Sequence, residues 1–451
     1  MDAKVDVVRR EVIKPAAGAP HDRLQLSLVD LSCPAVYVGT IFFYKAIPGE
    51  SPEIISRRLR NSLSETLTRF YPLAGRIDGV SVNCNDEGAL FTEARTDHLL
   101  SDFLKNNLDN TESLGLFLPS VAPGESAGTW PLLSVMVSFF GSGSGAAVTV
   151  SISHKICDAA SLLTFVQGWA ATMKGAISND MALTIPNFVG STIYPPPHTS
   201  FQSPSVDDLL EFRGKCVTNR LVFKSSKIAA LKCKAASESL LVPTRVEAIM
   251  SLIWICATKA SRSNSVSPKS TLMTQAMDLR LRIPTNVLPK NAMGNLQSAF
   301  FLKIDAESPM DIGEIVVQFR KAKEGINDMI EENLQGYHTD STVVTTSTLG
   351  QNLLGVLQKF MTGLTPDIDM YGMSSWCKKP FYEVDFGWGN PVWIGSASHT
   401  ICDNLVYVLL LDSKDGEDVE AWVGLPKQDM PVFVRDPDLL TYAVVNPPVL
   451  I

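Results

Sequence analysis

The sequence predicts an α/β fold with more than one domain. Strand patterns, in which apolar and polar residues alternate, are interspersed with helix patterns, in which apolar residues recur every third or fourth position. The 451 residues suffice for two large domains or three small ones. A proline-rich passage at 181–206 interrupts this series of elements and indicates a crossover or linker between domains.

The first half carries strong local signals. Ser51 and Pro52 suit the N-cap and first turn of a helix. Residues 126–153 carry no charge, but the Gly/Ser run at 141–145 splits them into two short alternating segments, so a β-hairpin is expected there and not a membrane span. The expected elements are strands at 5–13, 36–44, about 78–83, about 88–94, 130–140 and 146–153, the pair 78–83 and 88–94 joined by a turn at 85–88, and helices at about 52–69 and 159–174.

The second half again mixes strands and helices. Thr244 and Glu247 form a capping-box pattern before one helix, and Ser308 and Pro309 precede a long amphipathic one. The expected elements are helices at 245–260 and from 308 to about 333, and strands at 270–277, 296–304, 371–376, 381–385, 391–396, 405–411 and 419–424.

Composition narrows the class of protein. There are 39 Lys and Arg against 47 Asp and Glu, so the net charge of −8 disfavours nucleic acid as a partner. None of the eight cysteines forms a C-x-x-C pair, which predicts neither a metal site nor a disulfide framework. Reduced thiols and the absence of an apolar signal core at the N-terminus lead us to expect a cytoplasmic protein.

A histidine at the end of a predicted strand is the main candidate for chemistry. The strand 146–153 delivers His154, and Asp158 stands where the next helix begins. A neutral imidazole can accept a proton from a hydroxyl or an amine. The alternative is a loop histidine beside an N-cap aspartate, without a catalytic role. His399 and Asp403 repeat the H-x-x-x-D spacing, but a strand pattern follows them instead of a small-residue helix, so we interpret them as a chance match in a surface turn.

Two further clusters lie near the C-terminus. Residues 385–389 spell D-F-G-W-G, where two glycines around a tryptophan indicate a sharply turning backbone beside a buried ring. Just upstream, Ser374 and Trp376 offer a hydroxyl and an indole donor.

Together these motifs make the sequence resemble the plant BAHD acyl-CoA-dependent acyltransferases. The resemblance rests on H-x-x-x-D, D-F-G-W-G, Y-P-L-A-G-R at 71–76 and C-N-D-E-G-A-L-F-T-E-A at 84–94, in the expected order along essentially the whole chain. It implies a chloramphenicol acetyltransferase-like fold of two similar domains, each with a mixed sheet flanked by helices, and a channel between them. The implied boundaries are 1–185, a crossover at 186–212, and 213–451.

The resemblance also implies roles for residues. His154 would be the general base, and Asp158 would point away from the channel to an ion pair with Arg280; an aspartate orienting the imidazole, as in a triad, is the alternative. Positions facing the intermediate or acceptor would be Ser374, Trp376 and Asn295, although Met293 replaces the aromatic residue that relatives carry before the Gly-Asn pair. The residues expected to be structural are Asp385, Gly387, Trp388 and Gly389.

The implied co-substrate is an acyl-CoA, with acetyl-CoA favoured, and the implied partner is a small-molecule acceptor such as an alkaloid or another alcohol. No metal, nucleic acid or membrane is expected, and the protein is expected to be a monomer. The chain has no glycine-rich phosphate loop, so Arg262 or Arg282 is the candidate for a CoA phosphate; the alternative is that both are solvated surface arginines. Alternatives are a hydroxycinnamoyl or benzoyl transferase and a non-catalytic metabolite-binding relative. Carnitine and chloramphenicol acyltransferases share the two-domain design but lack D-F-G-W-G.

Overall fold

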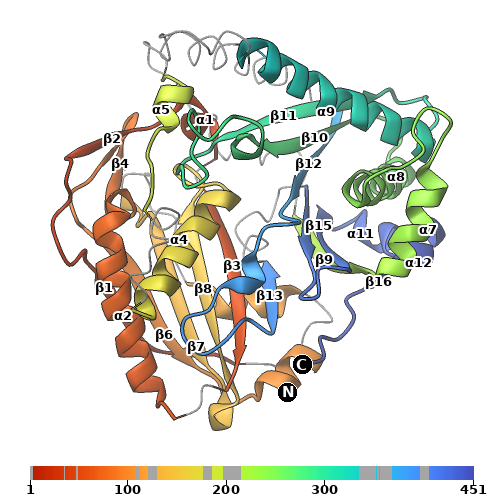
Figure 1. Cartoon of the computed structure of the whole chain (residues 1–451). Coiled ribbons are helices and arrows are strands. Elements are labelled where there is room, and N and C mark those ends of the chain that lie inside the picture. Colours follow the sequence, from red (N-terminus) through yellow and green to blue (C-terminus); the bar gives the residue numbers. More distant parts are fainter. Residues whose placement is uncertain are drawn as a thin grey trace.

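Two mixed β-sheets, each with helices packed on it, form the protein (Figure 1). A computed structural model describes residues 4–34, 36–46, 49–106, 111–119, 129–175, 185–196, 215–334, 352, 355, 368–396 and 406–451. Each sheet anchors its own large apolar core. The predicted α/β architecture of two similar halves is therefore confirmed.

The first sheet has the strand order β1-β6-β7-β8-β3-β13. Only β6 and β7 run parallel; every other neighbouring pair is antiparallel. The predicted hairpin across the Gly/Ser turn is present as β7 and β8. The strands are β1 (Asp6–Ile13), β3 (Tyr37–Lys45), β6 (Ala89–Arg95), β7 (Leu133–Phe139), β8 (Gly145–Ser153) and β13 (Trp393–Ser396).

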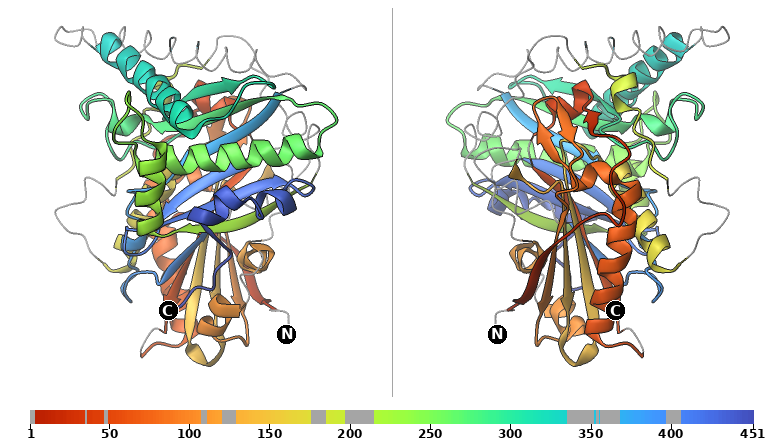
Figure 2. Two further views of the ribbon diagram at one scale, coloured as in Figure 1. Left: turned by 90° about the vertical axis from the view of Figure 1, so that its right-hand side faces the viewer. Right: turned by 90° about the vertical axis from the view of Figure 1, so that its left-hand side faces the viewer.

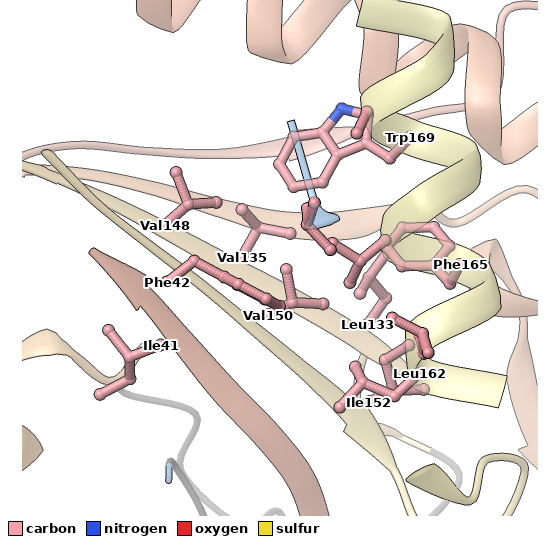
Figure 3. Packing of buried hydrophobic residues seen from close by; sticks show 14 of the residues in the cluster. Ile41, Phe42, Leu133, Val135, Val148, Val150, Ile152, Leu162, Phe165 and Trp169 are labelled. Carbon is pink, nitrogen blue, oxygen red and sulfur yellow. The ribbon is translucent and has the colours of Figure 1, made fainter. Parts of the chain in front are cut away.

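Helices α2 (Pro52–Arg69) and α4 (Ala159–Met173) lie side by side against one face of this sheet (Figure 1). Leu162, Phe165 and Trp169 of α4 pack on the valines and Phe42 of the sheet, whereas Ile41 points to the opposite face (Figure 3). The buried, apolar side of α4 thus fixes the helix that follows the H-x-x-x-D loop.

The last strand of the first sheet comes from the far end of the chain. Residue Trp393 of β13 pairs with Phe43 of β3, and Ser396 pairs with Thr40. The C-terminal part of the sequence therefore completes the N-terminal sheet.

The second sheet has the order β11-β10-β12-β14-β15-β9-β16. The central strands β10, β12 and β14 run parallel, and the remaining pairs are antiparallel. The strands are β9 (Cys216–Phe223), β10 (Ser270–Asp278), β11 (Gln297–Ile304), β12 (Ile368–Ser375), β14 (Tyr407–Asp412), β15 (Val419–Pro426) and β16 (Val444–Val445).

The long helix α8 (Arg245–Asn264) crosses this sheet (Figure 2, left). It begins with the predicted capping box of Thr244 and Glu247. Around it lie α7 (Ser225–Ala235), α9 (Ile312–Leu334), α11 (Met430–Phe433) and α12 (Pro437–Tyr442). In the part of the chain that is described, no helix is long and apolar enough to cross a membrane.

Short elements make the remaining connections. A small sheet is formed by β2 (Arg23–Gln25), β4 (Arg76–Asp78) and β5 (Ser81–Asn83), and the short helices include α1 (Leu28–Ser32), α3 (Leu100–Asn106) and α5 (Gly190–Ile193).

Two local predictions were wrong, and one capping residue lies in its predicted place without the expected hydrogen bond. The strand predicted at 78–83 is instead part of a hairpin of β4 and β5 at 76–83. Strand β6 pairs with β1 and β7 and not with this hairpin, because its apolar face is buried in the large sheet. Residues 381–385 are not a strand; they contain the 3₁₀ turn η7 (Phe381–Glu383). Ser51 occupies the N-cap position of α2, but its side chain makes no capping hydrogen bond.

Candidate active site

The loop between β8 and α4 holds His154 at the junction of the two halves. The His154 amide donates to the carbonyl of Val36, just before β3, at 2.7 Å. The His154 carbonyl accepts a hydrogen bond of 2.6 Å from the side-chain amide of Asn295, which precedes β11. The histidine backbone is therefore fixed from both halves, while its side chain stays partly exposed.

The imidazole of His154 is suited to accept a proton. Burial lowers its pKa below the usual value of 6.5, so the ring is neutral at neutral pH. Its Nδ1 atom is buried and has no hydrogen-bond partner among the described residues. Of the hydrogen bonds between described residues, those to the Asp158 carboxylate come from Arg280, Ser161 and Leu296 and not from this ring, which differs from the arrangement of a triad.

Asp158 forms the predicted ion pair with Arg280. Arg280 donates to the two carboxylate oxygens at 2.8 and 3.2 Å, and both side chains are almost fully buried. Asp158 also caps α4 by accepting from the Ser161 amide, and it accepts from the Leu296 amide. Burial alone would raise the pKa of Asp158, but the Arg280 charge and these donors outweigh it and lower the pKa.

Arg280 extends this contact into a network across the two halves. Besides Asp158, it donates to the carboxylate of Asp278 and to the carbonyls of Ala292 and Gly294. Lys379, which follows β12, donates to the other oxygen of Asp278 at 2.7 Å. The alternating charges compensate one another, so the network ties the His154 loop to three segments of the second half.

Asn295 is fully buried beside the His154 backbone, and hydrogen bonds to Asp30 fix its position. The Asp30 carboxylate accepts from the Asn295 amide and from the Asn295 side chain, each at 2.8 Å, and from the amide and hydroxyl of Ser27. Sequence reasoning missed Asp30, although Ser27-x-x-Asp30 is a capping-box pattern that opens α1. The contact of Asn295 with an intermediate stays a prediction; its geometry favours a role in positioning His154.

Ser374 lies near the end of β12, and Trp376 directly follows this strand. Ser374 is partly exposed, and the Trp376 ring is buried and stacked on Phe381 with centroids 5.1 Å apart. The ring centroid of Phe381 in turn lies 6.4 Å from that of Phe42 of β3. This aromatic series joins the end of β12 to the first sheet.

The D-F-G-W-G segment builds a tight turn. Asp385 accepts from the amides of Gly387 and Gly389, each at 2.8 Å, and both glycines have positive φ values, 102° and 98°. These left-handed backbone conformations favour glycine. Phe386 is fully buried with its ring against Trp169 of α4, and Trp388 packs edge-on against Tyr44.

The turn lies far from His154. Asp158 caps the beginning of α4, and Lys174, at its C-cap, lies 3.5 Å from Asp385. A helix of 15 residues is about 22 Å long at 1.5 Å per residue. The D-F-G-W-G segment is therefore about 20 Å from the His154 loop and supports the far end of the helix that follows this loop.

The two arginines considered for CoA are already bonded within the protein. Arg262, in the last turn of α8, donates to the Asp305 carbonyl at 3.2 Å. Arg282 donates to Asn327 and to the Asp278 carbonyl, and burial lowers its pKa. Contact of either with a phosphate stays a prediction. The second H-x-x-x-D pattern, at 399–403, lies outside the described residues.

Comparison with known proteins first defines the class. The model of the Transferase family matches residues 3–440, and the chain is a transferase. It is 60% identical to "BAHD acyltransferase BIA1" of Arabidopsis thaliana, over 100% of both proteins. It is 34% identical to "Akuammiline synthase 1" of Alstonia scholaris, over 97% of both.

Solved structures agree with these relatives. The crystal structure of vinorine synthase superposes with a TM-score of 0.76 and 30% identity, covering 95% of this chain and 96% of that one. The structure of F. graminearum TRI101 gives a TM-score of 0.68 at 16% identity, which shows the shared fold. The chain belongs to the BAHD acyltransferase family, as the sequence motifs predicted, and is an acyltransferase.

Proposed function

We propose that this protein transfers an acyl group, most simply acetyl, from CoA to a hydroxyl of a plant specialised metabolite, with His154 as the general base. The observation that carries the proposal is a neutral, partly exposed imidazole held at the junction of the two halves by backbone contacts from both.

The reaction needs one proton acceptor. Nε2 of His154 takes the proton of the acceptor hydroxyl, and the oxygen attacks the thioester carbonyl of the acyl-CoA. The tetrahedral oxyanion then collapses, the C–S bond breaks, and the CoA thiolate leaves with the proton from His154. Ser374 and the indole of Trp376 are the groups we propose near that oxyanion, from their place at the end of β12.

Asn295 would set the tautomer that this step requires. Its Oδ1 atom and Nδ1 of His154 are both buried, and neither has a hydrogen-bond partner in the described part of the chain. The two residues are already joined through the His154 carbonyl. Pairing Nδ1–H with Oδ1 in the substrate complex would leave Nε2 free to accept a proton.

The names of several relatives support O-acetylation. They include "Limonoid 21-O-acetyltransferse" of Melia azedarach, 32% identical, and "Minovincinine 19-hydroxy-O-acetyltransferase" of Catharanthus roseus, 30% identical. A hydroxycinnamoyl or benzoyl donor is the alternative within the family, and a panel of acyl-CoAs with plant metabolites, followed by thiol release and mass spectrometry, separates the two.

The decisive variant is His154→Ala. Loss of a general base lowers kcat by roughly 10²–10⁴-fold, and circular dichroism should show an intact fold. His399→Ala, which breaks the second H-x-x-x-D pattern, is the matched control and should keep its activity. Activity lost in the His399 variant and kept in the His154 variant would reverse the assignment.

A further inference from the structure

A cavity of about 700 Å³ lies beside the segment that ends the chain, residues 446–451. Its wall includes Arg220 and Val222 of β9, Tyr382, Trp393 of β13, Lys414, and Val449. The terminal segment runs from the second sheet along the first, where the Val449 amide donates to the Leu104 carbonyl of α3 (Figure 2). Both halves and the chain end therefore build this cavity.

The cavity is distinct in position from His154. Trp393 pairs with Phe43, whereas the residue before His154, Ser153, pairs with Tyr37. Six residues of β3 separate these two levels, which corresponds to about 20 Å at 3.3 Å per residue. The cavity volume is in the range of sites that hold small organic molecules.

The inner wall of the cavity is mostly apolar, and its charged side chains, Arg220 and Glu420, are paired with each other. Arg220 is ion-paired with Glu420 at 3.2 Å, and its guanidinium lies 5.4 Å from the centre of the Trp393 ring. The Trp393 indole also donates to Glu420. Apolar side chains fill most of the remaining wall, including the valines at 222, 392, 444 and 449 and the prolines at 447 and 448.

The charged side chains at the rim of the cavity differ in the hydrogen bonds and ion pairs that they make within the protein. Asp418 accepts from Lys224 at 2.7 Å and from the Ser225 amide, and Asp415 accepts from the Ser413 hydroxyl and the Glu417 amide. Glu420 is held inside by Arg220, so Glu420 and Asp418 are each paired with a cation, whereas the hydrogen-bond donors to Asp415 are neutral. Lys414, an exposed residue, has no hydrogen bond or ion pair in the part of the chain that is described.

We propose that this cavity binds an amphipathic monoanion, such as a long-chain carboxylic acid, at a site separate from the acyl-transfer centre. The apolar body would lie against Trp393 and the valine and proline wall, and the acid group would pair with the Lys414 ammonium. This inference does not depend on the reaction proposed above, since it concerns another place in the fold.

The test uses the full-length protein and the dye 1-anilinonaphthalene-8-sulfonate, which combines an aromatic body with one sulfonate. Its fluorescence should rise on binding, with energy transfer from tryptophan, and dodecanoate should displace it more effectively than dodecanol. Lys414→Gln should weaken dye binding about two- to fivefold at low salt, the size expected for one exposed ion pair, and added salt should reduce the difference.

A second variant tests the cavity from its other wall. Leu450 is 76% exposed, so the Leu450→Glu variant should fold normally. It places a negative charge at the rim of the cavity and should therefore weaken the binding of the anionic dye further. Lys427→Gln removes the same charge from an exposed position outside the cavity and should bind the dye like the wild type. The proposal is overturned if both cavity variants match the wild type, if dodecanol competes as well as dodecanoate, or if saturating CoA displaces the dye.

Discussion

Removing the Asp158 carboxylate should destabilise the folded protein and also lower kcat. In Asp158→Ala, the charge of Arg280 remains buried without its main partner, and the amides of Ser161 and Leu296 lose their acceptor. Breaking a buried ion pair by removing one partner costs about 3–5 kcal/mol of unfolding free energy. At about 1 °C per kcal/mol for a protein of 451 residues, the melting temperature should fall by roughly 3–5 °C.

The assay is a pair of measurements on the same preparations, the melting temperature and kcat. Glu307→Ala, which removes an exposed carboxylate without a partner in the described residues, is the control and should change neither. The pKa of Asp158 is lowered in the folded state, so its stabilisation is present above its usual value of 3.8 and is lost as the pH falls through the lowered pKa. The melting difference between Asp158→Ala and the wild type should therefore shrink only in strong acid.

One result would refute this reasoning. If Asp158→Ala melted like the wild type but had lost turnover, the carboxylate would act on the imidazole, and the triad-like alternative would be correct.

Four other outcomes follow from the geometry. Asn295→Ala should lower kcat about 10- to 100-fold with little change in KM, because it frees the His154 carbonyl; an unchanged kcat would remove Asn295 from the mechanism. In kcat/KM profiles, the acid limb should lie below pH 6.5, because burial lowers the His154 pKa and activity falls only as the pH drops through it; a limb above 6.5 would contradict the assignment. Asp385→Ala should lower the melting temperature by a few degrees and leave KM of the surviving enzyme near normal, whereas a raised KM would place the turn near substrate. If Arg282→Ala and Arg262→Ala both leave KM for acyl-CoA unchanged at low salt, the phosphate site lies elsewhere.

The sequence predicted what local patterns encode. The alternating run before His154, the helix after Asp158 and the capping box at Thr244 all follow from periodicity and capping chemistry, and the structure contains them. The ion pair between Asp158 and Arg280, 122 residues apart, was expected only through the resemblance to a family.

The missed features depend on contacts between distant segments. Nothing near Asp30 in the sequence shows that its carboxylate meets Asn295, 265 residues later. The strand at 89–95 was assigned to the wrong partner for the same reason, since two adjacent strand patterns fit a hairpin as well as they fit separate sheets. Burial in a sheet, and not local preference, decided between these arrangements.

The placement of β13 has a consequence for how the chain must be made. Until about 396 residues have left the ribosome, the edge of β3 has no neighbour on that side, because Trp393 and its strand do not yet exist. An uncovered strand rich in Ile41, Phe42 and Phe43 is a template for pairing with other chains. The first half should therefore aggregate when it is expressed alone, and its native folding should be completed only after synthesis of the second.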